Sequence, residues 1–298
     1  MEQAIKDQLG LENLKILKLT PNTIETDQGR MFLKYGDETL VNGEFESLKA
    51  IQATGAIRCP KPIGIVKKNE STALITSYIA FRHRKNWAML GEQLGRMHMK
   101  NAENLSSKTR RSGFVAGSLA EDVQELPTEK FGFHVATCCG RLPQDNTWTD
   151  SWTEFFIQRR LKPQIDRLIE TSTYSRDLLD LESALYRKTD ELLRNRRGVT
   201  PALVHGDLWG GNWSMMVMEY SESKEDDMVP VVFDPAASYS DPEFEFGIMS
   251  MFGGWTAEFE REYDKVMGDA DKKSRARRLL LYELYHNLNH WNHFGGSY

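Results

Sequence analysis

The stretch "VHGDLWGGNW", Val204 to Trp213, decides the fold, because it places an acid and an amide five positions apart where a regular helix is unfavourable. The acid is Asp207 and the amide is Asn212, with two adjacent glycines between them. Glycine inside a helix costs about 1 kcal/mol relative to alanine. The short apolar run 201–204 comes just before. The pattern therefore predicts a strand that ends in a loop of defined shape, and such loops often carry chemistry.

The residues around this loop supply the parts that phosphoryl transfer needs. The reaction requires cations that bridge phosphate oxygens, ligands that hold the cations, and a carboxylate that receives the acceptor's proton. Asp207 fits the carboxylate base. Asn212 and Asp234, which directly follows the apolar run 229–233, offer the oxygen ligands that suit Mg²⁺.

Two upstream residues complete this pattern. Lys34 ends the predicted strand "MFLK", and Glu44 lies near the start of the next predicted helix. A strand lysine held by a helix glutamate is the arrangement that reaches the α- and β-phosphates of ATP. The alternative makes Lys34 and Glu44 a surface ion pair, Asn212 a turn residue and Asp234 a strand-ending cap. The shared order of all these residues along the chain favours the catalytic interpretation.

Longer stretches resemble the fructosamine-3-kinase family, also called ketosamine or protein-ribulosamine 3-kinases, within the wider group of aminoglycoside phosphotransferases and protein kinases. They are spread from about residue 30 to the C-terminus and read "LGEQLGRMH", "KFGFHVATCCGRLPQDNTWTDSW", "HGDLWGGNW", "FDPAASYSDPEFEFGIMSMFGG" and "NLNHWNHFG". The resemblance implies that Asp207 is the catalytic base, that Asn212 and Asp234 are the metal ligands, and that Lys34, with Glu44 as its partner, binds the ATP phosphates. It also implies the reaction: ATP-dependent phosphorylation, with Mg²⁺, of the sugar 3-hydroxyl of ketosamines on lysines or small amines, a deglycation step.

The sequence departs from the family before the strand lysine. Kinases usually carry a glycine-rich hairpin there, whereas "KLTPNTIETDQGRMFLK" holds only Gly29. Glycines let backbone N–H groups approach phosphates closely, and Pro21, Thr23 and Ile24 lack that freedom. Either the phosphates are bound mainly by Lys34 and the metal, or nucleotide binding is weakened. A pseudokinase or binding module therefore remains an alternative, as does a kinase for another small-molecule alcohol.

Hydrophobic periodicity predicts a small α+β part followed by a mainly helical part, and the resemblance implies that together they form a two-lobed, protein-kinase-like fold. A small mixed N-terminal lobe, 1–80, would bind the nucleotide, and a larger, mainly helical C-terminal lobe, 81–298, would carry catalysis and substrate binding. The predicted elements of the first lobe are a helix over 1–18, strands over 23–26, 30–35, 63–66 and 73–78, and a helix over 43–54. The active site is expected in the cleft between the lobes.

Trp209 and His205 are the candidate substrate-binding residues. Trp209 lies two residues beyond the proposed base, where its ring would stack on the sugar or on the amine-bearing stem, or else pack into the core. His205 precedes Gly206 and Asp207, and bracing of the loop through backbone hydrogen bonds is favoured over direct acid/base work.

Two further clusters allow other interpretations. His286, His290 and His293 share one face of a predicted helix and would suit zinc, but the glutamate of an H-E-x-x-H motif is missing, and a packed helix is favoured. Cys138 and Cys139 are adjacent, which disfavours a strain-free disulfide, so small apolar filling is favoured over a reactive pair.

Composition narrows the class of protein. The 298 residues carry a formal net charge of −5 without a basic stripe, which argues against a nucleic-acid partner. Three cysteines give no even disulfide framework and suggest a reducing compartment. The N-terminus lacks the apolar region of a signal peptide, and no apolar run approaches 18 residues. We therefore expect a cytoplasmic protein without membrane association.

Overall fold

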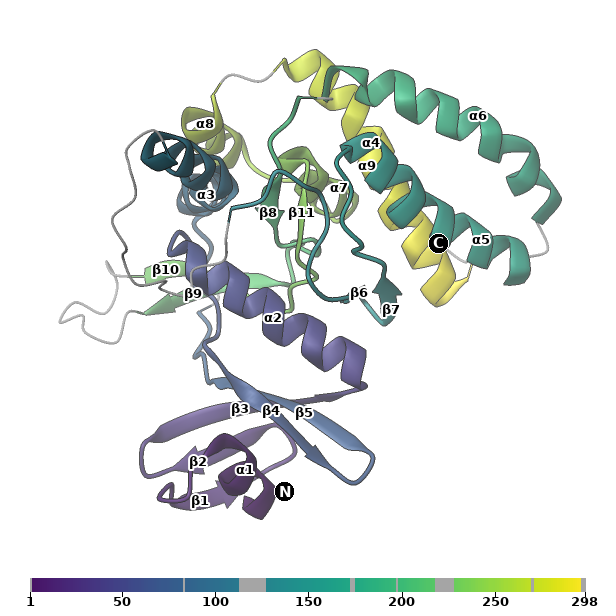
Figure 1. Ribbon diagram of the computed structural model, residues 1–298. Helices are drawn as coiled ribbons and strands as arrows, with labels where there is room; N and C mark the ends of the chain where they lie inside the picture. Colours follow the sequence, from purple (N-terminus) through teal and green to yellow (C-terminus); the bar gives the residue numbers. More distant parts are fainter. Residues whose placement is uncertain are drawn as a thin grey trace.

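The computed structural model describes residues 2–82, 84–112, 127–171, 175–196, 198–217, 228–268 and 271–295. A five-stranded sheet lies at one end, and most helices lie at the other (Figure 1). The sheet strands are β1 (Ile16–Leu19), β2 (Thr23–Thr26), β3 (Gly29–Gly36), β4 (Pro62–Lys68) and β5 (Ser71–Ser77). The helices are α1 (Glu2–Leu9), α2 (Glu38–Thr54), α3 (Trp87–Ser112), α4 (Trp152–Phe156), α5 (Lys162–Thr171), α6 (Ser175–Leu193), α7 (Glu245–Met251), α8 (Ala257–Met267) and α9 (Lys272–Phe294).

The sheet is antiparallel and has the strand order β1-β2-β3-β5-β4. β3 lies in its centre, so Lys34 is paired on a central strand, opposite Leu74 of β5. α1 packs through Ile5 against one face of the sheet, where a small apolar core forms. The members of this core are Ile5, Ile24, Leu33, Val66, Ala73 and Ile75.

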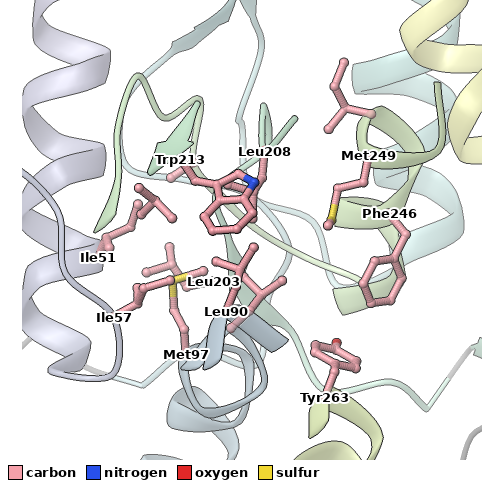
Figure 2. Packing of buried hydrophobic residues seen from close by; sticks show 14 of the residues in the cluster. Ile51, Ile57, Leu90, Met97, Leu203, Leu208, Trp213, Phe246, Met249 and Tyr263 are labelled. Atoms are coloured by element: carbon pink, nitrogen blue, oxygen red, sulfur yellow. The ribbon is translucent and has the colours of Figure 1, made fainter. Parts of the chain in front are cut away.

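α2 lies between the sheet and the helical part of the molecule (Figure 1). Val41 and Leu48 of this helix pack against Leu74 of the sheet. Its C-terminal half contributes Ala50 and Ile51 to the large core of the helical part. Figure 2 shows Ile51 and Ile57 beside residues of that core, and the labelled core residues are Leu90, Met97, Leu203, Leu208, Trp213, Phe246, Met249 and Tyr263. The helix therefore belongs to both cores.

Short strand pairs in the helical part present the loops that carry the predicted site. They are β6 (Thr137–Cys139) with β7 (Leu142–Gln144), β8 (Ala202–Val204) with β11 (Ser238–Ser240), and β9 (Trp213–Val217) with β10 (Met228–Val232). A 3-10 turn, η2 (Arg194–Arg196), precedes β8, and another, η3 (Pro242–Phe244), precedes α7. A π-helical segment, η1 (Ile157–Leu161), joins α4 to α5.

The predicted helix over 1–18 is wrong beyond its first half. α1 ends at Leu9, and Gly10 adopts a left-handed φ of 64°, a conformation that stops a helix. The chain then forms β1, the outer strand of the sheet. The lobe boundary that the sequence predicts near residue 80 falls in the connection 78–86 between β5 and α3, and we propose that the two lobes join there.

Candidate active site

The loop between β8 and β9 holds its shape through a compact set of backbone contacts. The N–H of Trp209 donates to the carbonyl of Asp207 at 3.1 Å, and the N–H of Asn212 donates to the carbonyl of Trp209 at 2.9 Å. Gly206 has a φ of 81°, and a Cβ there would lie 2.2 Å from the carbonyl oxygen of Ala236. The glycine that fixes the start of the loop is therefore Gly206.

The two glycines inside the loop act differently from one another. A Cβ on Gly211 would lie 2.3 Å from the indole of Trp209, so this glycine makes room for the ring. A Cβ on Gly210 would meet only the end of the Lys85 side chain, at 3.7 Å. The ammonium of Lys85 donates to the Gly210 carbonyl at 2.5 Å and lies over the Trp213 ring. Burial lowers the pKa of Lys85.

Asp207 and Asn212 are in direct contact. The Asn212 amide donates to the Asp207 carbonyl at 2.9 Å and to its carboxylate at 3.0 Å. Burial raises the pKa of Asp207 to about 7, the charge of Asp234 adds to the shift, and the Asn212 hydrogen bond opposes it. The carboxylate is therefore poised near neutrality, as general bases commonly are.

Lys34 connects the sheet to α2 and to the loop that follows β10. Its ammonium lies 2.6 Å from Oε2 of Glu44 and 2.7 Å from Oδ1 of Asp234. Burial alone lowers the pKa of Lys34, but the carboxylates of Glu44 and Asp234 outweigh it, so the pKa is raised and the ammonium stays charged. Asp234 adopts a left-handed φ of 57°, a strained conformation for a residue with a side chain, and such strain is concentrated at functional sites.

These residues line one cavity of about 270 Å³. Its lining includes every predicted catalytic, phosphate-binding and metal-binding position and, on the rim, Trp209. The sequence did not point to the other lining residues, which are Leu40, Cys138, Gly140 and Pro235. Cys138 and Gly140 come from the β6–β7 hairpin, whose glycine occupies the first position of a two-residue turn with a φ of 66°.

The turn between β1 and β2, residues 20–22, is short and lies beside β3. The last pair of β2 with β3 is Thr23 with Phe32, and the carbonyl of Asn22 accepts the N–H of Leu33. The turn closes on itself through Thr20, whose hydroxyl accepts the Thr23 N–H at 2.9 Å. The predicted absence of a glycine-rich loop therefore corresponds to a short, closed turn.

Glu245, in the first turn of α7, anchors the loop that carries Asp207. This residue was not identified from the sequence. Its fully buried carboxylate accepts the N–H groups of His205 at 2.5 Å and of Gly206 at 3.0 Å. Nε2 of His98 lies 3.5 Å from the same carboxylate, and Tyr263 hydrogen-bonds Nδ1 of His98. Burial raises the pKa of Glu245, but the contacts with His98 and His205 together outweigh it and the net shift is downward. A glutamate inside the apolar run "FEFGIM" was the available signal.

Comparison with known proteins shows the family. The chain matches the family described as "Fructosamine kinase" over residues 20–298. It belongs to the fructosamine kinase family. A ketosamine-3-kinase of Mus musculus is 35% identical and aligns with 100% of this chain and 96% of its own. A chloroplastic protein-ribulosamine 3-kinase of Arabidopsis thaliana is 33% identical over 92% of this chain and 74% of its own.

Solved structures show the same fold. A candidate fructosamine-3-kinase from Haemophilus somnus 129PT superimposes with a TM-score of 0.73 at 19% identity, over 100% of this chain and 92% of that one. A crystal structure of an aminoglycoside phosphotransferase gives 0.50 at 13% identity, over 100% and 95% of the two chains. The fold of this fructosamine kinase family member is thus protein-kinase-like, as the sequence predicted.

The two candidate substrate-binding residues of this kinase differ in exposure. Trp209 is 36% exposed at the cavity rim and packs against Phe252 in a tilted arrangement, with 4.9 Å between ring centroids. His205 is completely buried; its Nδ1 accepts the Asp207 N–H and its Nε2 donates to the Phe233 carbonyl. A substrate contact by His205 does not fit this placement, whereas the bracing interpretation does.

His293 and His286 of α9 are engaged in hydrogen bonds and in ring packing, respectively. Among the described residues, no group of three histidine, cysteine or acidic side chains could hold a metal ion. His293 accepts the Arg141 N–H through Nε2 and donates through Nδ1 to Asn289, while His286 is buried against Phe244.

The cysteines are unpaired thiols. Burial raises the pKa of Cys138 to about 11, and it raises that of Cys139 as well, so neither is an activated thiolate. Cys139 fills the interior, as expected, but Cys138 lines the cavity. Within the described ranges, no helix is both long and apolar enough to cross a membrane.

Proposed function

We propose that this protein transfers the γ-phosphoryl group of ATP to the sugar 3-hydroxyl of ketosamines. One observation carries the proposal: Lys34 and Asp234, separated by 200 residues in sequence, are bonded in the same cavity that holds Asp207 and Asn212. The order and type of these residues are those that phosphoryl transfer requires. The names of the ketosamine and ribulosamine kinases to which the chain is similar support the acceptor.

In this reaction Asp207 is the general base. The acceptor oxygen forms a bond to the γ-phosphorus, the bond to the β–γ bridging oxygen breaks, and ADP leaves with that oxygen. The hydroxyl proton passes to the Asp207 carboxylate, whose pKa of about 7 suits a base at neutral pH. Lys34 remains charged and stabilises phosphate oxygens, with Glu44 holding its ammonium in place.

Asn212 and Asp234 fit Mg²⁺. Asn212 uses its amide nitrogen to bond Asp207, so its amide oxygen remains as a ligand. The Asp234 carboxylate is 46% exposed and lines the same cavity. Oxygen donors of these two kinds suit a hard cation. When bound, Mg²⁺ would neutralise charge on the phosphate oxygens.

The charge of the cavity as a whole suits a cationic sugar derivative. Three carboxylates and one ammonium line the cavity, namely Glu44, Asp207, Asp234 and Lys34, so its charge is negative. A ketose linked to an amine is positively charged at neutral pH and is attracted to such a site. The exposed Trp209 ring offers a flat surface on which the sugar or the amine stem can stack.

The decisive experiment measures ADP release from MgATP with ribulosyl-lysine or fructosyl-lysine as acceptor, beside Asp207→Asn. We expect acceptor-dependent release that falls about 10²-fold or more in the variant, as is typical for loss of a general base. MgATP binding, read as a thermal shift, should remain. Unchanged turnover in Asp207→Asn would remove Asp207 from this role.

The same experiment separates the alternatives. A pseudokinase would release no ADP with any acceptor, whereas a kinase for another alcohol would respond to other members of an acceptor panel. The paired Lys34 and Glu44 favour an active enzyme. The cytoplasmic location stays a prediction, supported by the three unpaired cysteines.

A further inference from the structure

The helix that carries Glu44 contacts the β6–β7 hairpin backbone to backbone. A Cβ on Gly43 would lie 2.7 Å from the carbonyl oxygen of Ala136 and 2.9 Å from Cα of Thr137. Gly43 has no left-handed φ, so the helix does not need glycine for its conformation. Glycine inside a helix costs roughly 0.5–1 kcal/mol relative to alanine. The close approach to the hairpin is therefore what requires this residue.

Two side chains fasten α2 to both chain segments beside the cavity. One turn after Gly43, the hydroxyl of Ser47 accepts the N–H of Ala237 at 3.1 Å and donates to the Gly43 carbonyl at 2.6 Å. On the neighbouring face, Glu46 contacts Nε2 of His134 at 3.1 Å. The helix is thus held by the segment before β6 and by the segment after Asp234.

The hairpin against which α2 rests is itself fixed. Thr137 donates to Gln144 within the hairpin, and the amide nitrogen of Gln144 donates to the hydroxyl of Tyr285 in α9. At the turn, the N–H of Arg141 donates to Nε2 of His293 at 2.9 Å. A side chain added at Gly43 must therefore displace α2, because the hairpin is bonded on its far side.

We propose that the contact between Gly43 and β6 sets the position of Glu44 and, through Glu44, that of Lys34. The Lys34 ammonium is then in place for the phosphates before ATP binds. Gly43 and Ser47 are then positioning residues for nucleotide binding. Glu44 is adjacent to Gly43 and lies 2.6 Å from Lys34, so a shift of the helix moves the carboxylate directly. The inference rests on the proposed function only in that ATP is the ligand.

The test compares Gly43→Ala with Gly91→Ala, a matched helix glycine away from the cavity. A Cβ on Gly91 would lie 2.3 Å from the Phe259 carbonyl oxygen, so both variants force a helix away from a backbone oxygen. We expect Gly43→Ala to raise the Kd for MgATP and the KM for ATP about 10-fold, below the roughly 10² that a 1 Å misplacement can cost. The KM for the ketosamine should change less. Gly91→Ala should lower stability and leave both ATP constants unchanged.

A double-mutant cycle with Glu44→Gln tests the route. If Gly43 acts through Glu44, adding Gly43→Ala to Glu44→Gln weakens MgATP binding little further. If the two substitutions instead raise the Kd for MgATP independently, so that their fold-changes multiply in the double variant, the proposal is overturned. An unchanged MgATP affinity in Gly43→Ala, or an equal loss of MgATP affinity in Gly91→Ala, would also overturn it. Ser47→Ala, which adds no bulk, should weaken MgATP binding in the same direction, and it replaces Gly43→Ala if that variant does not fold. MgATP binding without ketosamine-dependent ADP release in the wild type would reject the proposed acceptor but leave this inference standing, whereas no MgATP binding would overturn it.

Discussion

Glu245 shows how a single buried charge supports the loop that carries Asp207. Its two carboxylate oxygens accept the N–H groups of His205 and Gly206, so the backbone just before the proposed base is fixed from beneath. In Glu245→Gln an amide NH₂ must face one of these donors. Loss of a buried hydrogen bond of this kind costs about 1–3 kcal/mol.

We therefore expect Glu245→Gln to lower kcat by roughly 10-fold while the KM for ATP changes little, because the loop and not the Lys34 pair is disturbed. Steady-state kinetics would measure this. Glu243→Gln is the matched control: Glu243 is also buried but pairs with Arg278 and does not touch the loop. Equal losses of kcat in both variants would show a general loss of stability instead.

Lys85 acts on the same loop from the other side. Its ammonium bonds the Gly210 carbonyl and lies 4.5 Å from the centre of the Trp213 ring. Lys85→Met should keep the packing of the stem and lose the hydrogen bond, which lowers kcat by about 5-fold if the bond contributes about 1 kcal/mol. Lys85→Arg should restore most of the activity. A Lys85→Met variant with wild-type kcat would assign Lys85 to packing alone.

At the scale of elements, the sequence predicted β2, β3, β4 and β5 of the sheet and missed β1. The "MFLK" strand and the apolar run before Asp234 are visible because alternation and burial leave a local signal. The end of α1 at Gly10 and the anchor Glu245 were missed, since one depends on a single backbone conformation and the other on contacts distant in sequence. For the same reason, the packing of α2 on β6 cannot be inferred from periodicity.

The short β1–β2 turn gives a prediction for one element. Because the turn is short and pairs no further than Asn22 with Leu33, we expect that it does not cover the ATP phosphates. Pro21→Gly and Thr20→Ala should therefore change the KM for ATP by no more than about 2-fold, the range of ordinary surface substitutions. Lys34→Met should raise it far more. A large effect of either turn variant in ATP titrations would show that the turn closes over the nucleotide.

At the scale of the whole molecule, α2 joins two cores that a division near residue 80 would separate. Ala50 and Ile51 pack with the helical part, and the carbonyl of Arg58 accepts the N–H of Val232 in β10. The Lys34–Asp234 contact adds a third connection across the cavity. The cavity is therefore formed by residues from both sides of that division.

At the same scale, His286 makes a contribution to stability that is lost in acid, whereas the raised pKa values of Asp207 and Glu44 act in the opposite direction. The His286 ring is buried between Phe244 and Tyr285, and burial, with smaller contributions from His290 and Arg160, lowers its pKa to about 3. The unfolded chain binds a proton there near pH 6.5 and the folded chain does not, so this contribution is lost as the pH falls from about 6.5 to 3, by about 2 kcal/mol at pH 5. His286→Leu removes this contribution, so lowering the pH from 7.5 to 5 should favour the folded state by about 2 kcal/mol more in the variant than in the wild type. Urea unfolding at the two pH values measures this, and an equal change in both proteins would show that His286 does not carry the effect.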